Sequence, residues 1–284
     1  MKAALIVNDR AGSLSGIAEP RAALSAALRS GGFVLCDAPG EGVALDQQWA
    51  AVEGCGAEVV FVAGGDGTLR DAAARLLDGP RAFAPLPGGT MNRVCARLGL
   101  PEDALAAAAA YRPGRFGTLD VATANGEVFL YESIVGAPSR LMRFREMQRG
   151  GGMRGWWPVL RVAMRELARP TSRRLAIRTG VRRRSTGHAV VVTVPGPGEP
   201  ALLALHLARP AGFVARLRQA FRWFRGGLGD DAGVKSISGA RLVVHGRTPW
   251  LRLSLDGEMH LIPGPVRFRI RPRALRVLML PDGD

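Results

Sequence analysis

Glu58-Val-Val-Phe-Val-Ala-Gly-Gly-Asp-Gly-Thr-Leu-Arg-Asp-Ala-Ala-Ala-Arg-Leu-Leu77 is the stretch that decides the fold of this chain. Its first part is apolar and β-branched, which predicts a buried parallel strand. Apolar residues then recur at helical spacing from Leu69 to Leu77, and Gly79-Pro80 ends the predicted helix. The stretch therefore predicts a strand, a glycine turn and a helix.

The glycine turn, Gly64-Gly65-Asp66-Gly67-Thr68, has two interpretations. Glycines let backbone N–H groups close on an anion, and the helix N-terminus adds a partial positive charge. Asp66 is a carboxylate suited to a metal-bound phosphate. The alternative is an ordinary tight turn. The position of the motif, directly between such a strand and such a helix, favours phosphate binding.

Strands and helices alternate through the first part of the chain. Further strands are expected at 2–7, 33–36 and 82–86, and helices at 20–30, 43–52, 91–98 and 102–111. This rhythm predicts parallel pairing with right-handed crossovers. Ligands bind such open sheets at the carboxyl ends of the strands, where loops 8–16, 64–68 and 87–92 lie. We therefore expect one phosphate site built from all three loops.

The pattern changes near Gly117. Two strands between 119 and 131 are joined by Asn125-Gly126, a strong hairpin signal. Short alternating strands then dominate, at 175–179, 188–194, 202–207, 241–245, 251–255, 266–270 and 275–280. They predict an antiparallel sandwich or barrel. We expect an open α/β domain over 1–118 and a β-sandwich domain over 119–284, with the last strand returning toward the first domain.

The net charge of +15 is concentrated in the second part, because residues 121–284 contain 28 Lys and Arg against 11 Asp and Glu. Such a charge favours an anionic partner. No nucleic-acid recognition motif accompanies it. No apolar run reaches the roughly 18 residues of a membrane span. Cys36, Cys55 and Cys95 lack metal or redox spacing, which makes a reduced cytoplasm the default expectation.

Two helices are predicted within the second part, at 155–168 and 213–225. In the latter, one face carries apolar residues and arginines dominate elsewhere; the apolar residues are Phe213, Leu217, Ala220, Phe221 and Phe224. This composition is typical of a helix that lies in a membrane interface. The alternative is that the apolar stripe packs on the sandwich and the arginines face water.

Four motifs resemble the diacylglycerol kinase catalytic-domain family, which includes bacterial lipid kinases and sphingosine kinases. They are Gly64-Gly-Asp-Gly-Thr68, Pro87-Gly-Gly-Thr-Met-Asn92, Leu119-Asp120-Val and Leu255-Asp-Gly-Glu258. The resemblance implies ATP-dependent phosphorylation of a lipid hydroxyl with Mg²⁺. It also implies an α/β nucleotide-binding domain, similar to that of NAD kinases, followed by a β-sandwich domain with the site between them.

The resemblance also implies roles for individual residues. Glu258 would accept the proton of the lipid hydroxyl, Asp120 would be a second catalytic carboxylate, and Asp66 would work near the phosphate and the catalytic Mg²⁺. Nucleotide would be bound by Asn8, Gly64, Gly65, Asp66, Gly67, Thr68, Gly89, Thr90 and Asn92. Asp256-Gly257-Glu258 is also interpretable as a simple β-turn between strands.

The chain departs from the family at several positions. Arg93 follows Asn92 where the family usually has aspartate, Asn8 is followed by Asp9 where proline is usual, and Cys36-Asp37 occupies the place of a threonine. The segment 194–204 lacks the acidic motif beside which bacterial members hold a structural Mg²⁺. We therefore predict no structural Mg²⁺ site.

Three hypotheses follow. The first is a cytoplasmic lipid kinase that associates peripherally with an anionic membrane and has no nucleic-acid partner. The second is a kinase of a soluble small molecule, against which the second motif and Asp256-Gly257-Glu258 argue. The third is a degenerate homologue that binds nucleotide or membrane without catalysis, as Arg93 suggests. Whether the chain forms a homodimer stays open.

Overall fold

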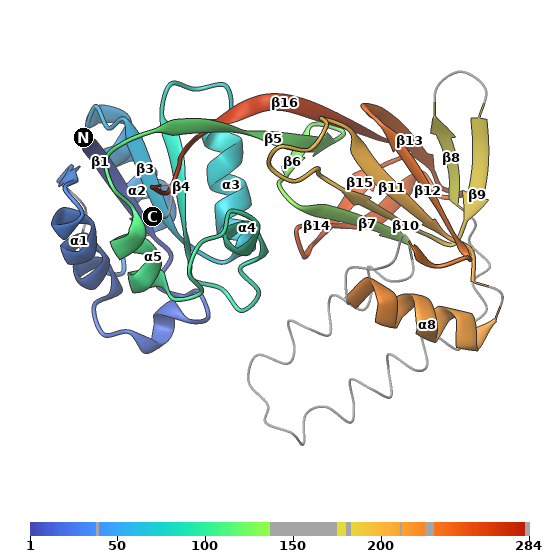
Figure 1. Cartoon of the computed structure of the whole chain (residues 1–284), viewed down its shortest axis with the longest axis horizontal. Helices are drawn as coiled ribbons and strands as arrows, with labels where there is room; N and C mark the ends of the chain where they lie inside the picture. Colours follow the sequence, from blue (N-terminus) through green and yellow to red (C-terminus); the bar gives the residue numbers. More distant parts are fainter. Residues whose placement is uncertain (38–39, 137–174, 180–182, 211, 225–229, 282–284) are drawn as a thin grey trace. The chain divides into compact units, whose positions relative to one another are not determined.

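The computed structural model describes residues 1–37, 40–136, 175–179, 183–210, 212–224 and 230–281 (Figure 1). The chain divides into two compact units. Unit 1 comprises Met1–Val121 and Pro272–Asp284, and unit 2 comprises Ala122–Arg271. The helix predicted at 155–168 lies outside the described residues.

Unit 1 is built on a parallel sheet whose strand order is β2-β1-β3-β4. Its strands are β1 (Lys2–Val7), β2 (Val34–Leu35), β3 (Val59–Gly64) and β4 (Ala82–Pro87). Every residue of β3 and β4 is buried, which explains why both strands are almost wholly apolar. The predicted open α/β fold is confirmed.

Five helices connect the strands of unit 1. They are α1 (Pro20–Ser30), α2 (Leu45–Gly54), α3 (Asp66–Leu76), α4 (Arg93–Arg97) and α5 (Ala104–Ala110), and a short 3-10 turn, η1, spans Leu14–Gly16. Because the strand order reverses after β2, right-handed crossovers place α1 on one face of the sheet and α2 and α3 on the other. Arg75 of α3 links α3 to α2. Its guanidinium donates to the carboxylate of Asp46 at 2.8 Å and lies over the ring of Trp49, and both of these residues belong to α2.

Unit 2 contains antiparallel β-structure, as predicted. One sheet has the order β12-β11-β10-β7-β14-β15, and strands β16, β13, β8 and β9 form the other. The first sheet comprises β7 (Glu132–Gly136), β10 (Ala189–Thr193), β11 (Leu203–Ala208), β12 (Val234–Gly239), β14 (Trp250–Leu255) and β15 (Glu258–Pro263). The second comprises β8 (Leu175–Thr179), β9 (Arg183–Gly187), β13 (Arg241–His245) and β16 (Val266–Leu278).

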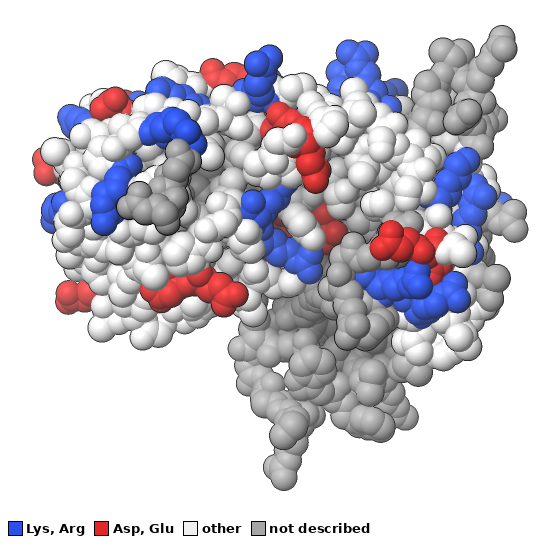
Figure 2. Space-filling model, viewed as in Figure 1, with Lys and Arg blue, Asp and Glu red and all other residues white. Residues whose placement is uncertain are grey.

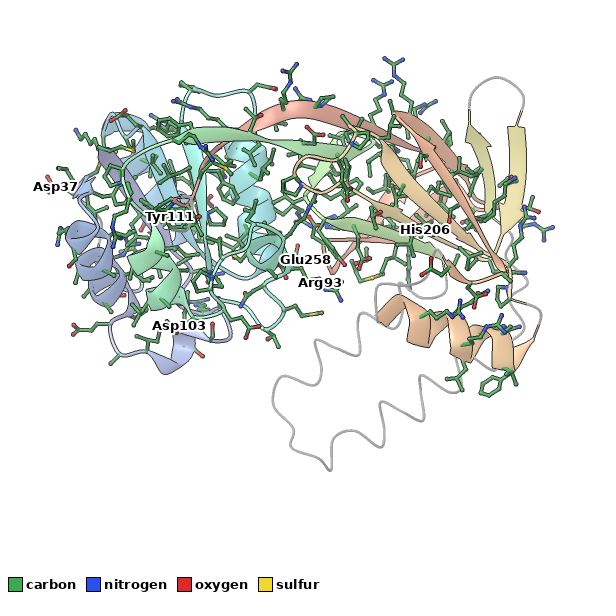
Figure 3. The ribbon with its side chains drawn as sticks, in the orientation of Figure 1. Asp37, Arg93, Asp103, Tyr111, His206 and Glu258 are labelled. Atoms are coloured by element: carbon green, nitrogen blue, oxygen red, sulfur yellow. A yellow bond between two sulfur atoms is a disulfide. The ribbon has the colours of Figure 1, made fainter. Side chains whose placement is uncertain are left out.

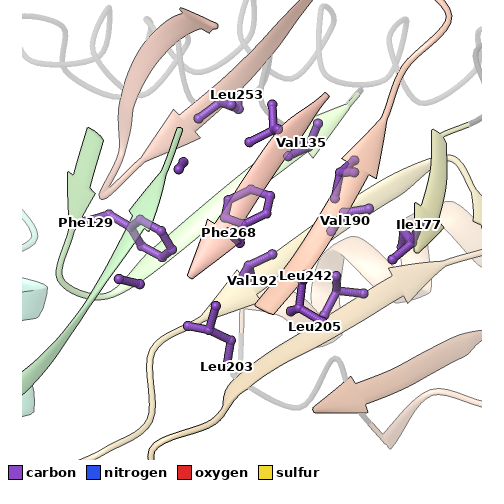
Figure 4. Packing of buried hydrophobic residues seen from close by; sticks show 14 of the residues in the cluster. Phe129, Val135, Ile177, Val190, Val192, Leu203, Leu205, Leu242, Leu253 and Phe268 are labelled. Carbon is purple, nitrogen blue, oxygen red and sulfur yellow. The ribbon is translucent and has the colours of Figure 1, made fainter. Parts of the chain in front are cut away.

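A large apolar core lies between these sheets (Figure 4). Val192 and Leu205 come from one sheet, and Leu242 and Phe268 from the other. The rings of Phe129 and Phe268 meet edge to face with their centroids 6.0 Å apart. The alternating apolar positions that predicted the strands therefore supply the packing between them.

A hairpin precedes this core. It consists of β5 (Phe116–Ala124) and β6 (Glu127–Phe129), which pair across Asn125-Gly126. Both turn residues have positive φ, 52° and 102°, as a type I′ turn requires. The Asn-Gly signal thus predicted the turn correctly.

The two C-terminal strands predicted at 266–270 and 275–280 are one strand, β16. Pro272 and Arg273 lie between the two predicted segments. Arg273 does adopt a positive φ of 51°, but its N–H donates to the Asp120 carboxylate at 2.8 Å, and the strand continues. It pairs with β13 in unit 2 and in parallel with β4 in unit 1.

Cys36 and Cys55 are joined by a disulfide in the structure, and Cys95 is buried as a free thiol. The sequence spacing did not predict this pair, because only the fold brings the end of β2 beside the end of α2. No helix in the described part of the chain is long and apolar enough to cross a bilayer.

Candidate functional site

Two glycine loops contact each other through their backbones at the carboxyl ends of β3 and β4. The N–H of Gly88 donates to the carbonyl of Gly64 at 2.9 Å. A Cβ on Gly88 would lie 2.9 Å from the Gly64 Cα, and one on Gly89 would lie 2.7 Å from the Gly65 Cα. These glycines are therefore required by close packing between the loops, in addition to any contact with a ligand.

The loop after β1 joins the same cluster. The N–H of Ser13 donates to the carbonyl of Gly88 at 3.0 Å, and the Asn8 Nδ2 donates to the Thr68 Oγ1 at 2.8 Å. A Cβ on Gly12 would lie 3.3 Å from the Thr90 Oγ1. The structure thus brings together the three loops from which we expected a phosphate site.

Helix α3 begins inside this cluster. Gly65 is its N-cap residue, in extended conformation, and the eleven-residue helix starts at Asp66. The first N–H groups of a helix have no partner within the helix, and the aligned peptide dipoles add positive potential there. Gly67 and Thr68 lie in this first turn and are only half-buried, an arrangement suited to an anionic group such as a phosphate.

Asp66 connects the first glycine loop to the second. Its Oδ1 accepts the N–H of Val94, near the start of α4, at 3.2 Å. Burial, aided by the negative charge of Asp66, raises the pKa of the Cys95 thiol well above its usual range. Cys95 therefore stays a neutral packing residue.

The second glycine loop contains two residues predicted to bind nucleotide and one that differs from the family. Asn92 has a φ of 44°, and its Oδ1 accepts the N–H of Gly89 at 2.7 Å, so its oxygen shapes the loop. Thr90 is exposed on the same loop. Arg93, which stands where the family usually has aspartate, begins α4 (Figure 3).

A buried polar network that the sequence did not reveal holds the end of β1. The Gln48 side chain pairs with the Val7 backbone, accepting its N–H at 2.8 Å and donating to its carbonyl at 2.9 Å. Arg21 donates to the Gln48 Oε1 at 2.5 Å, and burial lowers the pKa of its guanidinium. This network positions Val7 directly before Asn8.

Asp120 and Glu258 lie on strands. Asp120 is half-buried on β5, where its carboxylate accepts the N–H of Arg273, the residue of β16 with positive φ. Glu258 is the first residue of β15 and is labelled in Figure 3. Glu258 belongs to unit 2, whereas Asp120 and the glycine loops belong to unit 1.

The turn before Glu258 is fixed by Asp256. Asp256 and Gly257 have φ of 47° and 95°, and Leu255 pairs with Glu258, which defines a two-residue hairpin turn. The buried Asp256 carboxylate accepts three backbone N–H groups, those of Leu130, Tyr131 and Glu132, at 2.6, 2.8 and 3.0 Å. The turn interpretation of Asp-Gly is therefore correct, and the carboxylate is the anchor of that turn.

The segment 194–204, which lacks the family's acidic motif, closes on itself. The N–H of Gly196 donates to the Glu199 Oε2 at 2.8 Å, and the N–H of Glu199 donates to the Gly196 carbonyl at 3.1 Å. Within the described ranges, no group of three or more His, Cys, Asp or Glu residues is arranged to hold a metal ion.

Comparison with known proteins identifies the glycine-loop domain. Residues 2–124 match the diacylglycerol kinase catalytic domain. The resemblance drawn from the motifs is thereby confirmed. The matched part contains the three loops, α3 and Asp120, so family and fold together support a phosphotransferase.

Solved structures confirm the fold over the whole chain. A diacylglycerol kinase from Bacillus anthracis strain Sterne matches with a TM-score of 0.68 and 18% identity, covering 99% of this chain and 97% of that one. A structure from the same strain, described as a candidate diacylglycerol kinase, matches with a TM-score of 0.70 and 19% identity at the same coverage. At these identities the likeness concerns the fold.

Proposed function

We propose that this chain is an ATP-dependent lipid kinase that transfers the γ-phosphate to a hydroxyl of a diacylglycerol-like or sphingoid lipid. The observation that carries the proposal is the contact between the two glycine loops at the start of α3, within the part that matches a kinase catalytic domain. Phosphoryl transfer depends mainly on positioning and charge neutralisation, which backbone N–H groups and a helix N-terminus supply.

In this proposal the cluster in unit 1 binds the phosphates of ATP. The N-terminal turn of α3 receives the phosphates, and the bond from Asn8 to Thr68 holds the first loop against that turn. Mg²⁺ is commonly held by one or two carboxylates together with substrate phosphates, so Asp66 fits the ion that would neutralise charge on ATP. Asp120 acts as a second carboxylate of the site.

Glu258 accepts the proton from the lipid hydroxyl, a role that a carboxylate performs when it lies within hydrogen-bond reach of that proton. Two observations support a lipid as the acceptor. The strongly basic second part of the chain favours an anionic surface, and the structural neighbours are described as diacylglycerol kinases. Because the fold alone does not determine which molecule accepts the phosphate, the acceptor has to be identified by experiment.

The test incubates the protein with labelled ATP and Mg²⁺ and a panel of acceptors in detergent micelles. The panel contains diacylglycerols, sphingoid bases and, as a soluble acceptor, NAD. We expect label in a lipid and a loss of at least about 100-fold for Glu258→Gln, the range of general-base catalysis. Label in NAD alone would assign the chain to a soluble acceptor and overturn the proposal.

Glu127→Gln is a matched control for this substitution. Glu127 begins β6 after the turn Asn125-Gly126, just as Glu258 begins β15 after Asp256-Gly257. Both substitutions therefore remove one charge at the first residue of a strand after the same kind of turn. We expect Glu127→Gln to transfer label at the wild-type rate.

Arg93 favours one second candidate, a nucleotide-binding homologue without catalysis. The cation replaces a carboxylate at the start of α4, and the nearby Asp66 already bonds Val94. This candidate predicts that ATP binds, as measured by calorimetry, while no acceptor of the panel becomes labelled. Label that depends on Glu258 would exclude it.

A further inference from the structure

In the described part of helix α8 (Phe213–Phe224) in unit 2, a polar side chain is buried while three apolar side chains are exposed. Gln219 is only 4% exposed, whereas Val214, Leu217 and Phe213 are 76%, 45% and 37% exposed. A surface helix of a globular domain ordinarily does the opposite. Of the apolar stripe that the sequence predicted on this helix, Phe213 and Leu217 therefore point to solvent, and the structure does not describe the side chains of the other members.

Asp231 fixes this orientation. Its side chain is almost completely buried, and it accepts the Nε and Nη2 of Arg218 at 2.7 and 3.1 Å, the Gln219 Nε2 at 3.3 Å and the N–H of Gly233 at 2.9 Å. Arg222 adds a bond to the Asp230 carbonyl at 2.7 Å. Figure 2 shows basic and acidic side chains together where Figure 1 places α8. Charged and amide groups therefore hold α8 on unit 2, and Phe213, Val214 and Leu217 face outward.

We propose that α8 is a membrane-docking helix, which inserts Phe213, Val214 and Leu217 into the headgroup and acyl boundary of an anionic bilayer. The inference rests on the proposed function, because a lipid acceptor brings the protein to such a surface. Interfacial helices combine an outward apolar face with cations at its edges. The sequence of α8 contains three arginines and no carboxylate.

Charge and area favour a bilayer over a second copy of the chain. In a two-fold dimer α8 would face α8, so that the positive charge of each helix, which Asp231 offsets only in part, would repel that of the other. A stable protein interface also buries roughly 1,000 Å² or more, which three partly exposed side chains do not supply. Anionic lipid headgroups complement the arginines, and an acyl boundary accommodates a small apolar face.

The test is vesicle flotation without ATP, using phosphatidylcholine vesicles with and without phosphatidylglycerol. We expect the wild type to float with the anionic vesicles. The double variant Val214→Ser/Leu217→Ser should partition about tenfold more weakly, because it removes apolar groups that enter the bilayer. Both side chains are exposed, so thermal unfolding should be unchanged.

Val34→Ser is the matched control. Val34 lies on β2 in unit 1 and is 65% exposed, close to the 76% of Val214. The same chemical change at a comparably exposed valine should leave flotation at the wild-type level. An equal loss in Val34→Ser would show that general surface hydrophobicity, not α8, drives binding.

Three further outcomes would overturn the proposal. They are failure of the wild type to float, flotation of the double variant at the wild-type level, and a dimer in sedimentation velocity that the double variant loses without any vesicle binding. Label transfer by the wild type in detergent micelles tests the lipid-kinase proposal separately, since micelles offer no extended bilayer. Kinase activity without flotation refutes only the role of α8, and flotation without kinase activity refutes only the enzymatic proposal.

Discussion

Replacing Asp256 by alanine should lower the free energy of unfolding of unit 2 far more than a surface substitution does. The carboxylate is buried and satisfies three backbone N–H groups from the segment that leads into β7. Its own N–H donates to the Glu132 carbonyl at 2.9 Å, so the turn and the segment are tied in both directions. Asp256→Ala keeps the hydrogen bond from its own N–H to Glu132 and removes the carboxylate that accepts the other three.

The magnitude follows from these contacts. Each buried donor left without a partner costs about 1–3 kcal/mol, and water reaching the site reduces the sum to about 3–5 kcal/mol for the three. Alanine at a φ of 47° adds about 1 kcal/mol. The total, about 4–6 kcal/mol, is a large fraction of the roughly 5–15 kcal/mol by which proteins are stable. Asp256→Asn tolerates the positive φ and keeps one acceptor oxygen, so about 2 kcal/mol is expected.

The assay is urea unfolding followed by circular dichroism, with the wild type, Asp256→Asn and Asp256→Ala compared at one pH. The expected order of unfolding free energy is wild type, asparagine variant, alanine variant. An alanine variant within about 1 kcal/mol of the wild type would refute the anchoring role, because it would mean that the three N–H groups find other partners. Equal stability of the two variants would refute the contribution of the retained oxygen and of the positive φ.

Two further predictions concern the glycine loops and the contact between α8 and Asp231. Gly89→Ala places a Cβ 2.7 Å from the Gly65 Cα and should weaken ATP binding, measured by calorimetry, by about tenfold or more. The control is Gly16→Ala, whose Cβ meets no atom within 4 Å and which should bind ATP with the wild-type affinity. Equal affinities of the two variants would contradict the packing argument. The hydrogen bonds from Arg218 lower the pKa of Asp231, so its stabilisation is present above the ordinary carboxyl pKa of about 4 and is lost as the pH falls below it. The difference in unfolding free energy between the wild type and Asp231→Asn should therefore shrink as the pH is lowered. A difference that stays constant with pH would contradict the stabilising role of the ionised Asp231.

Much of unit 1 was predictable because its signals are local. Residues of β3 are buried on both sides and read as one apolar run, and the helix α1 begins at Pro20 and ends before Gly31, where sequence signals placed it. The three loops were predicted to meet because carboxyl ends of parallel strands share an edge. The contacts between Gly65 and Gly89 could not be predicted, since no sequence pattern specifies which backbones touch.

Other features depend on partners far apart in the chain. The sequence of strand β12 is largely polar, since none of its residues is buried, and the strand is defined by its pairing with β11. Asp256 bonds residues more than 120 positions away, and the pairing of Cys36 with Cys55 likewise depends on the fold. The orientation of α8 was left open because periodicity defines a face but not the direction in which it points.

The path of β16 determines the order in which the protein can be completed during synthesis. Unit 1 is discontinuous in the chain, since its last strand, the part of β16 after Arg271, is translated after all of unit 2. Until that part emerges, β4 has a hydrogen-bonding edge with no neighbour, the kind of edge that recruits other chains. A fragment cut after Val121 would keep every glycine loop and still carry this open edge. We therefore expect this fragment of unit 1 to aggregate when expressed alone, although it contains both glycine motifs and Asp120.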